Sequence, residues 1–95
     1  MWRVRPNISF ADLEKFGYRL EEFDYVVNKP YNYVLYVKEV FRDAILGCGV
    51  VILVKDGVVE VRKCYSCSYQ ILDDNDCQFY INDLIRAEML ERIGS

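Results

Sequence analysis

The sequence contains no histidine, and this absence excludes several kinds of site. Histidine is the commonest general base and the commonest metal ligand in proteins. Without it no Ser-His or Cys-His dyad can form, and a zinc site would need cysteine thiolates alone. An enzyme built on this chain would have to use carboxylates, lysine, tyrosine or cysteine. We therefore expect that the protein is not an enzyme.

Long apolar segments are also missing. The apolar run Val50–Val54 is far shorter than the roughly 20 residues that a membrane-spanning helix needs. The charged residues near Met1 are not followed by the apolar region of a signal peptide. We therefore expect a cytoplasmic protein without a membrane partner, whose cysteines are reduced thiols.

A positive charge excess is absent too, because the formal net charge is −3 and the isoelectric point is about 4.9. A phosphate-binding face is usually basic, so a nucleic-acid partner is not expected. The 95 residues are 53% hydrophobic and show no repeat, low-complexity tract or linker. This composition predicts one folded domain over residues 1–95.

The strongest structural signal is a β-hairpin between Gly49 and Lys63. Asp56-Gly57 is a preferred pair for a two-residue type I′ turn, and runs of β-branched residues flank it. Because side chains alternate across a strand, one face of this hairpin is entirely apolar. We expect that face to form the core of the protein, with these members: Val50, Ile52, Val54, Val59 and Val61.

Two helices are predicted at the ends of the chain. Ser9 and Gly17 have the positions of an N-cap and a C′ residue around a short helix over 10–16. The acidic run from Asp73 to Asp76 supplies caps for a longer helix that we expect to end near 87–89. A calcium loop is the alternative for this acidic run, but the expected glycine and bidentate glutamate are missing. Residues 90–93 are expected to form a short strand or a tail, against 2–5.

The remaining segments are predicted as strands. Residues 20–28 and 31–41 have strand patterns separated by a turn at 28–30, and 64–72 alternates cleanly. Residues 42–47 fit either one helical turn or a loop. The predicted fold class is therefore α+β: an antiparallel β-meander of about four strands with a short N-terminal helix and a longer C-terminal helix.

Two short motifs resemble a known group of proteins. The segment from Leu13 to Tyr18, LEKFGY, follows an N-terminal strand, and YINDLI from Tyr80 precedes LERI from Leu90. In this order the motifs are similar to small uncharacterised proteins carried by phages and prophages of Gram-positive bacteria. The resemblance implies a short strand, a helix, hairpin strands and a closing helix. It implies no activity and no catalytic residues.

The cysteines offer one candidate site. In the absence of histidine, a zinc site would require all four thiols, including the Cys64-x-x-Cys67 pair. A regular strand directs residues 64 and 67 to opposite faces, and a redox Cys-x-x-Cys normally begins a helix. We therefore expect no metal and no cofactor, and keep a structural zinc site as the alternative, with these ligands: Cys48, Cys64, Cys67 and Cys77.

Tyrosine is unusually frequent, with eight residues in the chain. Tyrosine is enriched at protein interfaces because it combines apolar area with a polar tip. The function predicted from the sequence is that of a small protein-binding module, a phage or prophage accessory protein that acts on another protein through a sheet face. A homodimer would use the same features. The residues expected to bind the partner are Tyr31, Tyr33, Tyr36, Tyr65 and Tyr69.

Overall fold

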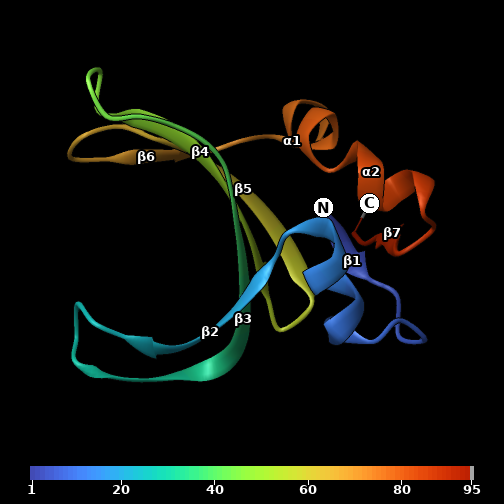
Figure 1. Ribbon diagram of the computed structural model, residues 1–95. Helices are drawn as coiled ribbons and strands as arrows, with labels where there is room; N and C mark the ends of the chain where they lie inside the picture. Colours follow the sequence, from blue (N-terminus) through green and yellow to red (C-terminus); the bar gives the residue numbers. More distant parts are fainter. Residues whose placement is uncertain (95) are drawn as a thin grey trace.

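The fold is built on one strongly curved antiparallel sheet with short helices on one of its faces (Figure 1). In this computed structural model, which describes residues 1–94, seven strands lie in the order β2-β3-β4-β5-β1-β7, and β6 pairs with β5. The predicted α+β class is confirmed, whereas about four strands was too low a number. The strands are β1 (Trp2–Val4), β2 (Arg19–Asp24), β3 (Lys29–Asp43), β4 (Cys48–Lys55), β5 (Val58–Cys64), β6 (Tyr69–Ile71) and β7 (Leu90–Arg92), and the helices are η1 (Phe10–Phe16), α1 (Asp74–Tyr80) and α2 (Asn82–Arg86).

The central hairpin has the predicted turn and register. Asp56 and Gly57 both have positive φ, at 49° and 87°, as a type I′ turn requires. Lys55 pairs with Val58 next to this turn, and the ladder continues to Gly49 and Cys64. The Asp56 carboxylate also accepts a hydrogen bond from the backbone N–H of Val34 at 2.8 Å, which fixes the turn against β3. Local turn chemistry therefore determines the alignment of three strands.

The predicted core face of this hairpin is buried. The five β-branched residues of that face are 0–5% exposed, with Ile52 and Val61 at 0%. Residues of η1, α1, α2 and β7 pack onto the same face and complete one cluster. Burial of each such side chain stabilises the fold by roughly 1.5–3 kcal/mol. The contributors from outside the hairpin include Leu13, Tyr18, Tyr36, Cys77, Ile81, Leu84, Met89 and Leu90.

The N-terminal helix has the predicted bounds but is a 3₁₀ helix. The Ser9 hydroxyl accepts a hydrogen bond from the backbone N–H of Ala11 at 3.2 Å, and Gly17 ends the helix with φ of 92°. The N–H of Tyr18 donates to the carbonyl of Leu13 at 3.2 Å, so the chain turns back at once. A helix of seven residues survives only through packing, and Leu13 is fully buried.

One connection lies elsewhere than predicted, and at the other the structure has the loop rather than the helical turn. The turn expected at 28–30 lies at 25–28, because the Asp24 carboxylate accepts hydrogen bonds from the N–H groups of Val26 and Val27 at 2.9 and 3.4 Å. At 42–47, strand β3 continues to Asp43 and a turn follows. The Asp43 carboxylate bonds the N–H groups at 45 and 46 in the same way, at 3.0 Å each. In both places a short side chain replaces the ladder hydrogen bonds.

The strand predicted over 64–72 is much shorter. Cys64 ends β5, and of the residues after it only β6 is a strand, which pairs with β5. Residues 65–68 form a tight turn between the two, in which the N–H of Tyr65 donates to the carbonyl of Ser68 at 2.7 Å. The alternation predicted Tyr65, Cys67 and Tyr69 on one strand face. Tyr65 and Cys67 instead lie in the turn, outside any strand. The clean period-two pattern of this segment gave no sign of the turn.

The long C-terminal helix is in fact two short helices. Helix α1 begins at the predicted cap, where Asp73 accepts from the N–H of Asp76 at 2.9 Å, and Ile81 separates it from α2. Asn82 and Asp83 follow the break and are weak helix formers, because their side chains compete for backbone hydrogen bonds. Glu88 then reverses the chain with φ of 58°. Of the two alternatives for residues 90–93, the strand is found: β7 pairs antiparallel with β1.

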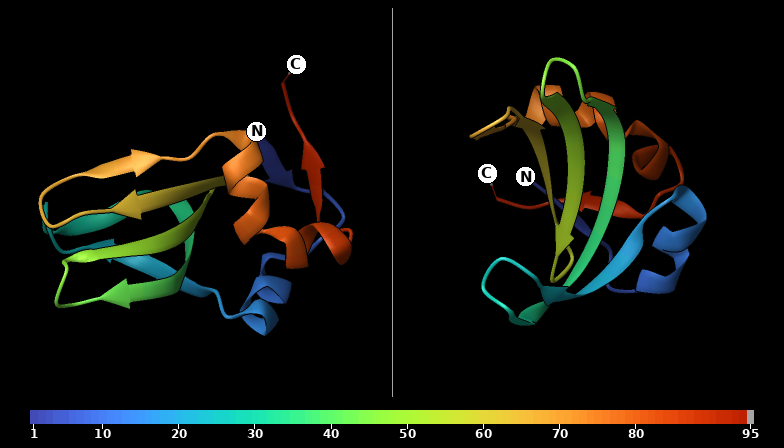
Figure 2. Two further views of the ribbon diagram at one scale, coloured as in Figure 1. Left: turned by 90° about the horizontal axis from the view of Figure 1, so that it is seen from above. Right: turned by 60° about the vertical axis from the view of Figure 1, so that its left-hand side comes forward.

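The sheet has a convex face and a concave face (Figures 1 and 2). The register shifts between Glu21 and Phe23 on β2 and between Glu39 and Phe41 on β3, and such irregularities increase local twist and bend a strand. The helices, β1 and β7 lie on the convex side, and the connections at 25–28, 44–47 and 65–68 project together from the opposite end (Figures 1 and 2). Within residues 1–94, no helix lies on the concave side (Figures 1 and 2).

Candidate binding face

The concave face is floored by apolar side chains that no helix covers. Strand pairing places Val37, Leu53 and Val51 on neighbouring strands of this face, with Leu35 and Val58 beside them. Leu35 is 3% exposed, whereas the other four are only half-buried. The floor is therefore an uncovered part of an otherwise closed sheet, and it comes from the hairpin face that the sequence showed to be mixed.

Charged side chains flank this floor, and most of them are already paired. Arg19 donates to Glu21 at 2.6 Å across β2, and Arg62 pairs with Glu60 on β5. Glu21 holds the pKa of Arg19 above its ordinary value, mainly through this hydrogen bond and then through its charge. Both pairs neutralise charge locally, the first in solvent and the second partly buried. Their effect is to leave the face with little net field.

Large apolar side chains lie fully in solvent at two ends of this face. Val26 is 94% exposed in the connection between β2 and β3, next to Tyr25 at 83%. Ile45 is 96% exposed in the connection between β3 and β4, next to Leu46 at 74%. None of these four residues is among the partner-binding residues predicted from the sequence. A usable signal existed, since two or more apolar residues directly after an aspartate that forms a turn are unusual in a solvated loop.

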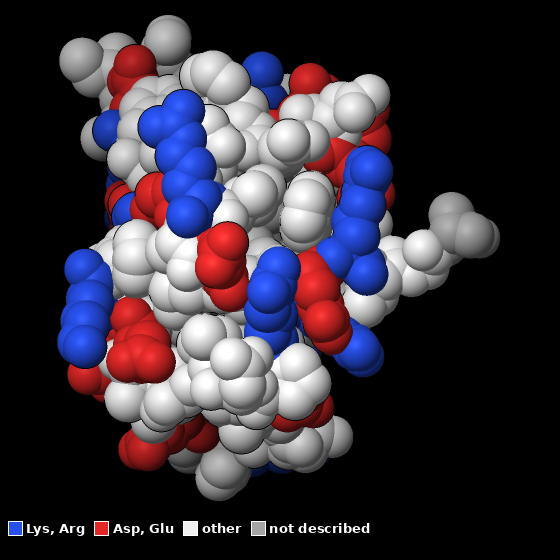
Figure 3. All heavy atoms as spheres, turned by 90° about the vertical axis from the view of Figure 1, so that its right-hand side faces the viewer, with Lys and Arg blue, Asp and Glu red and all other residues white. Residues whose placement is uncertain are grey.

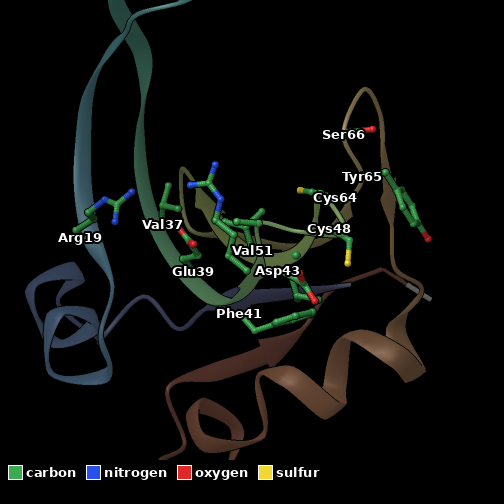
Figure 4. A pocket seen from close by; sticks show the side chains of 15 residues that line it. Arg19, Val37, Glu39, Phe41, Asp43, Cys48, Val51, Cys64, Tyr65 and Ser66 are labelled. Atoms are coloured by element: carbon green, nitrogen blue, oxygen red, sulfur yellow. The ribbon is translucent and has the colours of Figure 1, made fainter.

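A hollow of about 430 Å³ lies beside the curled ends of β3 and β4 (Figure 4). Val37, Glu39, Arg42 and Val51 line it from the concave side, and the turns at 44–47 and 65–66 contribute the rest of that wall. Strand β2 covers β3 only as far as Val37, so the hollow is open along the β3 edge. Its size suits a few side chains of a partner.

The structure separates the five tyrosines predicted to bind a partner. The prediction that Tyr36 lies on a partner-binding surface is wrong. Its side chain is 8% exposed on the convex face, and its ring centroid lies 5.9 Å from that of Phe10. The reason is strand alternation, because Tyr36 pairs with Val54 on the core face. Tyr65 is exposed in the turn after β5 and lines the hollow. Of the remaining three, Tyr33 and Tyr69 lie next to cations of the concave face.

Those three tyrosines lie at opposite borders of the concave face. The Tyr33 ring is 5.3 Å from the Tyr31 ring, and the ammonium of Lys55 is 5.5 Å from the Tyr33 ring centroid. Desolvation raises the pKa of Tyr31 above its ordinary value, with a smaller contribution from Asp24. On the other border, the Arg62 guanidinium lies 4.3 Å from the centre of the Tyr69 ring. Such cation–π contacts hold the rings in place without burying them.

The four cysteines do not converge. Cys48 and Cys64 belong to paired strands but point to opposite faces (Figure 4), Cys67 is exposed in the turn, and Cys77 is buried in the core. Within residues 1–94, no group of three or more cysteine or acidic side chains is arranged to hold a metal ion. The structure thus offers nothing in favour of the zinc alternative, or of a calcium loop at 73–76.

The Cys77 thiol is a core group rather than a nucleophile. Desolvation by burial raises its pKa from 9.0 to about 11, and the carboxylate of Asp74 adds to the shift. A hydrogen bond with the backbone of Val61 opposes it in part. The neutral thiol is unreactive, because only the thiolate attacks or binds metal. A second hollow of about 370 Å³ includes Cys77 where β5 is uncovered between β1 and β6.

The convex side carries the helices, and Phe79 of α1 is 80% exposed there. Basic and acidic side chains are interspersed over this side (Figure 3). Lys38 joins β3 to α2 through Asp83 at 3.7 Å. Tyr18 is buried beneath this layer, where desolvation and then the charge of Asp83 raise its pKa. These groups close the core and form no site.

Comparison with protein-family models, with curated proteins and with solved structures gives no match. Of the helices in residues 1–94, none combines the length and the apolar character needed to cross a membrane.

Proposed function

We propose that this protein is a small binding module that takes up a protein surface on its concave face. The observation that carries the proposal is the combination of an uncovered apolar floor with Tyr25, Val26, Ile45 and Leu46 at 74–96% exposure around it. Contiguous apolar surface on a small protein is typically a site of interaction. Rigid aromatic rings at its borders are typical anchors of protein interfaces.

The charge pattern favours a protein over a nucleic acid as the partner. Single-stranded nucleic acid requires a basic groove beside the stacking aromatic rings. Here Arg19 and Arg62 are neutralised by neighbouring glutamates, and the cation nearest Tyr33 is a single lysine. The resemblance to phage and prophage proteins makes a phage or host protein the class of partner. This origin, the cytoplasmic location and the lack of catalysis stay predictions.

Site-specific photo-crosslinking tests the proposal. A photoreactive amino acid at position 46 or 69 of the concave side should give a discrete crosslinked product in cells that produce the protein. The matched controls place it at Glu14 of η1 and Arg86 of α2, which are exposed on the convex side. Equal crosslinking from both sides would contradict a dedicated face. Binding of a labelled single-stranded oligonucleotide that is lost on Tyr69→Ala would replace the protein partner by nucleic acid.

A further inference from the structure

The chain as a whole exposes more surface than a compact monomer of its mass should. A compact protein of 11.2 kDa exposes about 5,700 Å², whereas this chain exposes 6560 Å². The difference of about 900 Å² is close to the roughly 800 Å² that one partner buries in a standard interface. The most exposed apolar side chains, Val26 and Ile45, lie in the connections that project beyond the curled sheet. One partner of similar size would remove it.

Two unpaired charges of opposite sign lie at the mouth of the hollow. Glu39 pairs in register with Val51, and Arg42 with Gly49, so both side chains belong to the concave side of β3. Both residues are exposed, and among residues 1–94 neither has an ion-pair partner within 4.0 Å. A partner that matches this site needs a cation and an anion at the same spacing.

The chain itself carries such a matching pair. In an interface with two-fold symmetry, residue i of one copy meets residue j of the other, and the reverse contact follows automatically. With the axis beside this site, Arg42 of each copy meets Glu39 of the other. The same rotation lays the exposed Ile45 and Leu46 of one copy over the hollow of the other, because the turn at 44–47 adjoins the hollow.

We propose that the occupant of the concave face is a second copy of this chain, joined by reciprocal Glu39–Arg42 pairs and by mutual insertion of the turn at 44–47. This inference names the partner for the proposed function and rests on it. The tip of the turn supplies apolar area, and the hollow on the same chain supplies the space that receives it. The charges set the register of the two copies and oppose other alignments.

Charge reversal tests this arrangement directly. The purified chain should sediment as a dimer at about 100 µM, since interfaces of standard size give micromolar or tighter binding. Glu39→Arg places four cations at the interface and Arg42→Glu places four anions, so each variant should raise the dissociation constant of the dimer by at least about tenfold. An equimolar mixture of the two variants should form heterodimers, because each contact then joins opposite charges. The cis double variant Glu39→Arg/Arg42→Glu should restore the homodimer.

Two charge reversals on the convex side serve as matched controls. Glu14→Arg and Arg86→Glu reverse exposed charges on the convex side and should leave dimerisation unchanged. Circular dichroism checks that every variant stays folded. A monomer at about 100 µM, or a dimer that ignores both reversals, or variants that the mixture does not rescue, each overturns the inference. If the chain is monomeric while positions 46 and 69 still crosslink to another protein in cells, the proposed function stands and only the second copy is wrong.

Discussion

The two faces of strand β4 differ in environment far more than in composition. Val50, Ile52 and Val54 face the convex side and are 0–3% exposed, whereas Val51 and Leu53 face the concave side and are only half-buried. Both sets are aliphatic, so hydrophobicity alone does not separate them. What separates them is the cover, since η1, α1, α2 and β7 all pack on one side. An aliphatic row without cover is therefore the feature that points to a partner.

The ion pairs show the same contrast. On the convex side Lys38–Asp83 joins β3 to α2 and helps to hold this helix over the core. On the concave side Arg19–Glu21 and Glu60–Arg62 join residues two apart on one strand. The first kind ties the fold together, and the second only screens a surface.

The largest effect on stability is expected within β4, where two adjacent residues face opposite sides of the sheet. Ile52→Ala should lower the free energy of unfolding by about 2–5 kcal/mol, because it removes a fully buried side chain and leaves a cavity. Leu53→Ala should lower it by about 1 kcal/mol or less, because this side chain is half in solvent already. Urea denaturation at a protein concentration too low for association measures both. Similar losses for the two variants would remove the distinction between the faces.

The buried thiol gives a pH-dependent version of this comparison. Folding raises the pKa of Cys77 from 9.0 to about 11, so the native state holds its proton more tightly than the unfolded chain. The contribution of the protonated Cys77 thiol to the free energy of unfolding is complete below about pH 9 and is lost as the pH rises towards 11. At about 1.4 kcal/mol per pH unit it amounts to at most about 3 kcal/mol.

Unfolding measurements between pH 8 and pH 11 test this dependence. Cys77→Ala should flatten the decline relative to the parent protein, whereas Cys67→Ala should not, because Cys67 is exposed in a turn. The other titrating groups are common to all three proteins and cancel in the comparison. Parallel declines for the parent and Cys77→Ala would show that the thiol is not desolvated in the core.

The smallest expected effect on stability is at the exposed turn. Ile45→Ser should change the free energy of unfolding by less than about 0.5 kcal/mol, because the side chain is 96% exposed and loses no packing in the isolated chain. The same substitution should weaken binding on the concave face. Thermal unfolding of dilute protein, beside sedimentation of concentrated protein, separates the two effects. A large loss of stability in dilute protein would mean that this turn packs within its own chain.

Sequence reasoning succeeded where a structure is determined by neighbouring residues. The Asp56-Gly57 turn, the core face of the hairpin and the caps at Ser9, Gly17 and Asp73 are all confirmed. Each depends on side-chain size, on positive φ or on a hydrogen bond within a few residues. The same reasoning missed the turn at 65–68 and the break at Ile81, because the alternation and the apolar face persist through both.

The candidate face was only partly predictable. Strand parity places Tyr33 and Tyr36 on opposite faces of β3, yet both faces of this strand are apolar in sequence, so parity did not tell which one the helices cover. The order of the strands in the sheet could not be predicted from the sequence either. The outer edge of β5 is shared by β1 at one end and β6 at the other, two short segments separated by most of the chain.

By itself, the sequence determined the hairpin, its register and its core face, together with the absence of histidine chemistry. These follow from turn geometry, side-chain alternation and composition, which act over a few residues. Only the tertiary structure decided the curvature of the sheet, the burial of Tyr36 and the hollow beside Glu39 and Arg42. These depend on which distant segments cover which face, and that choice is made by packing of the whole core.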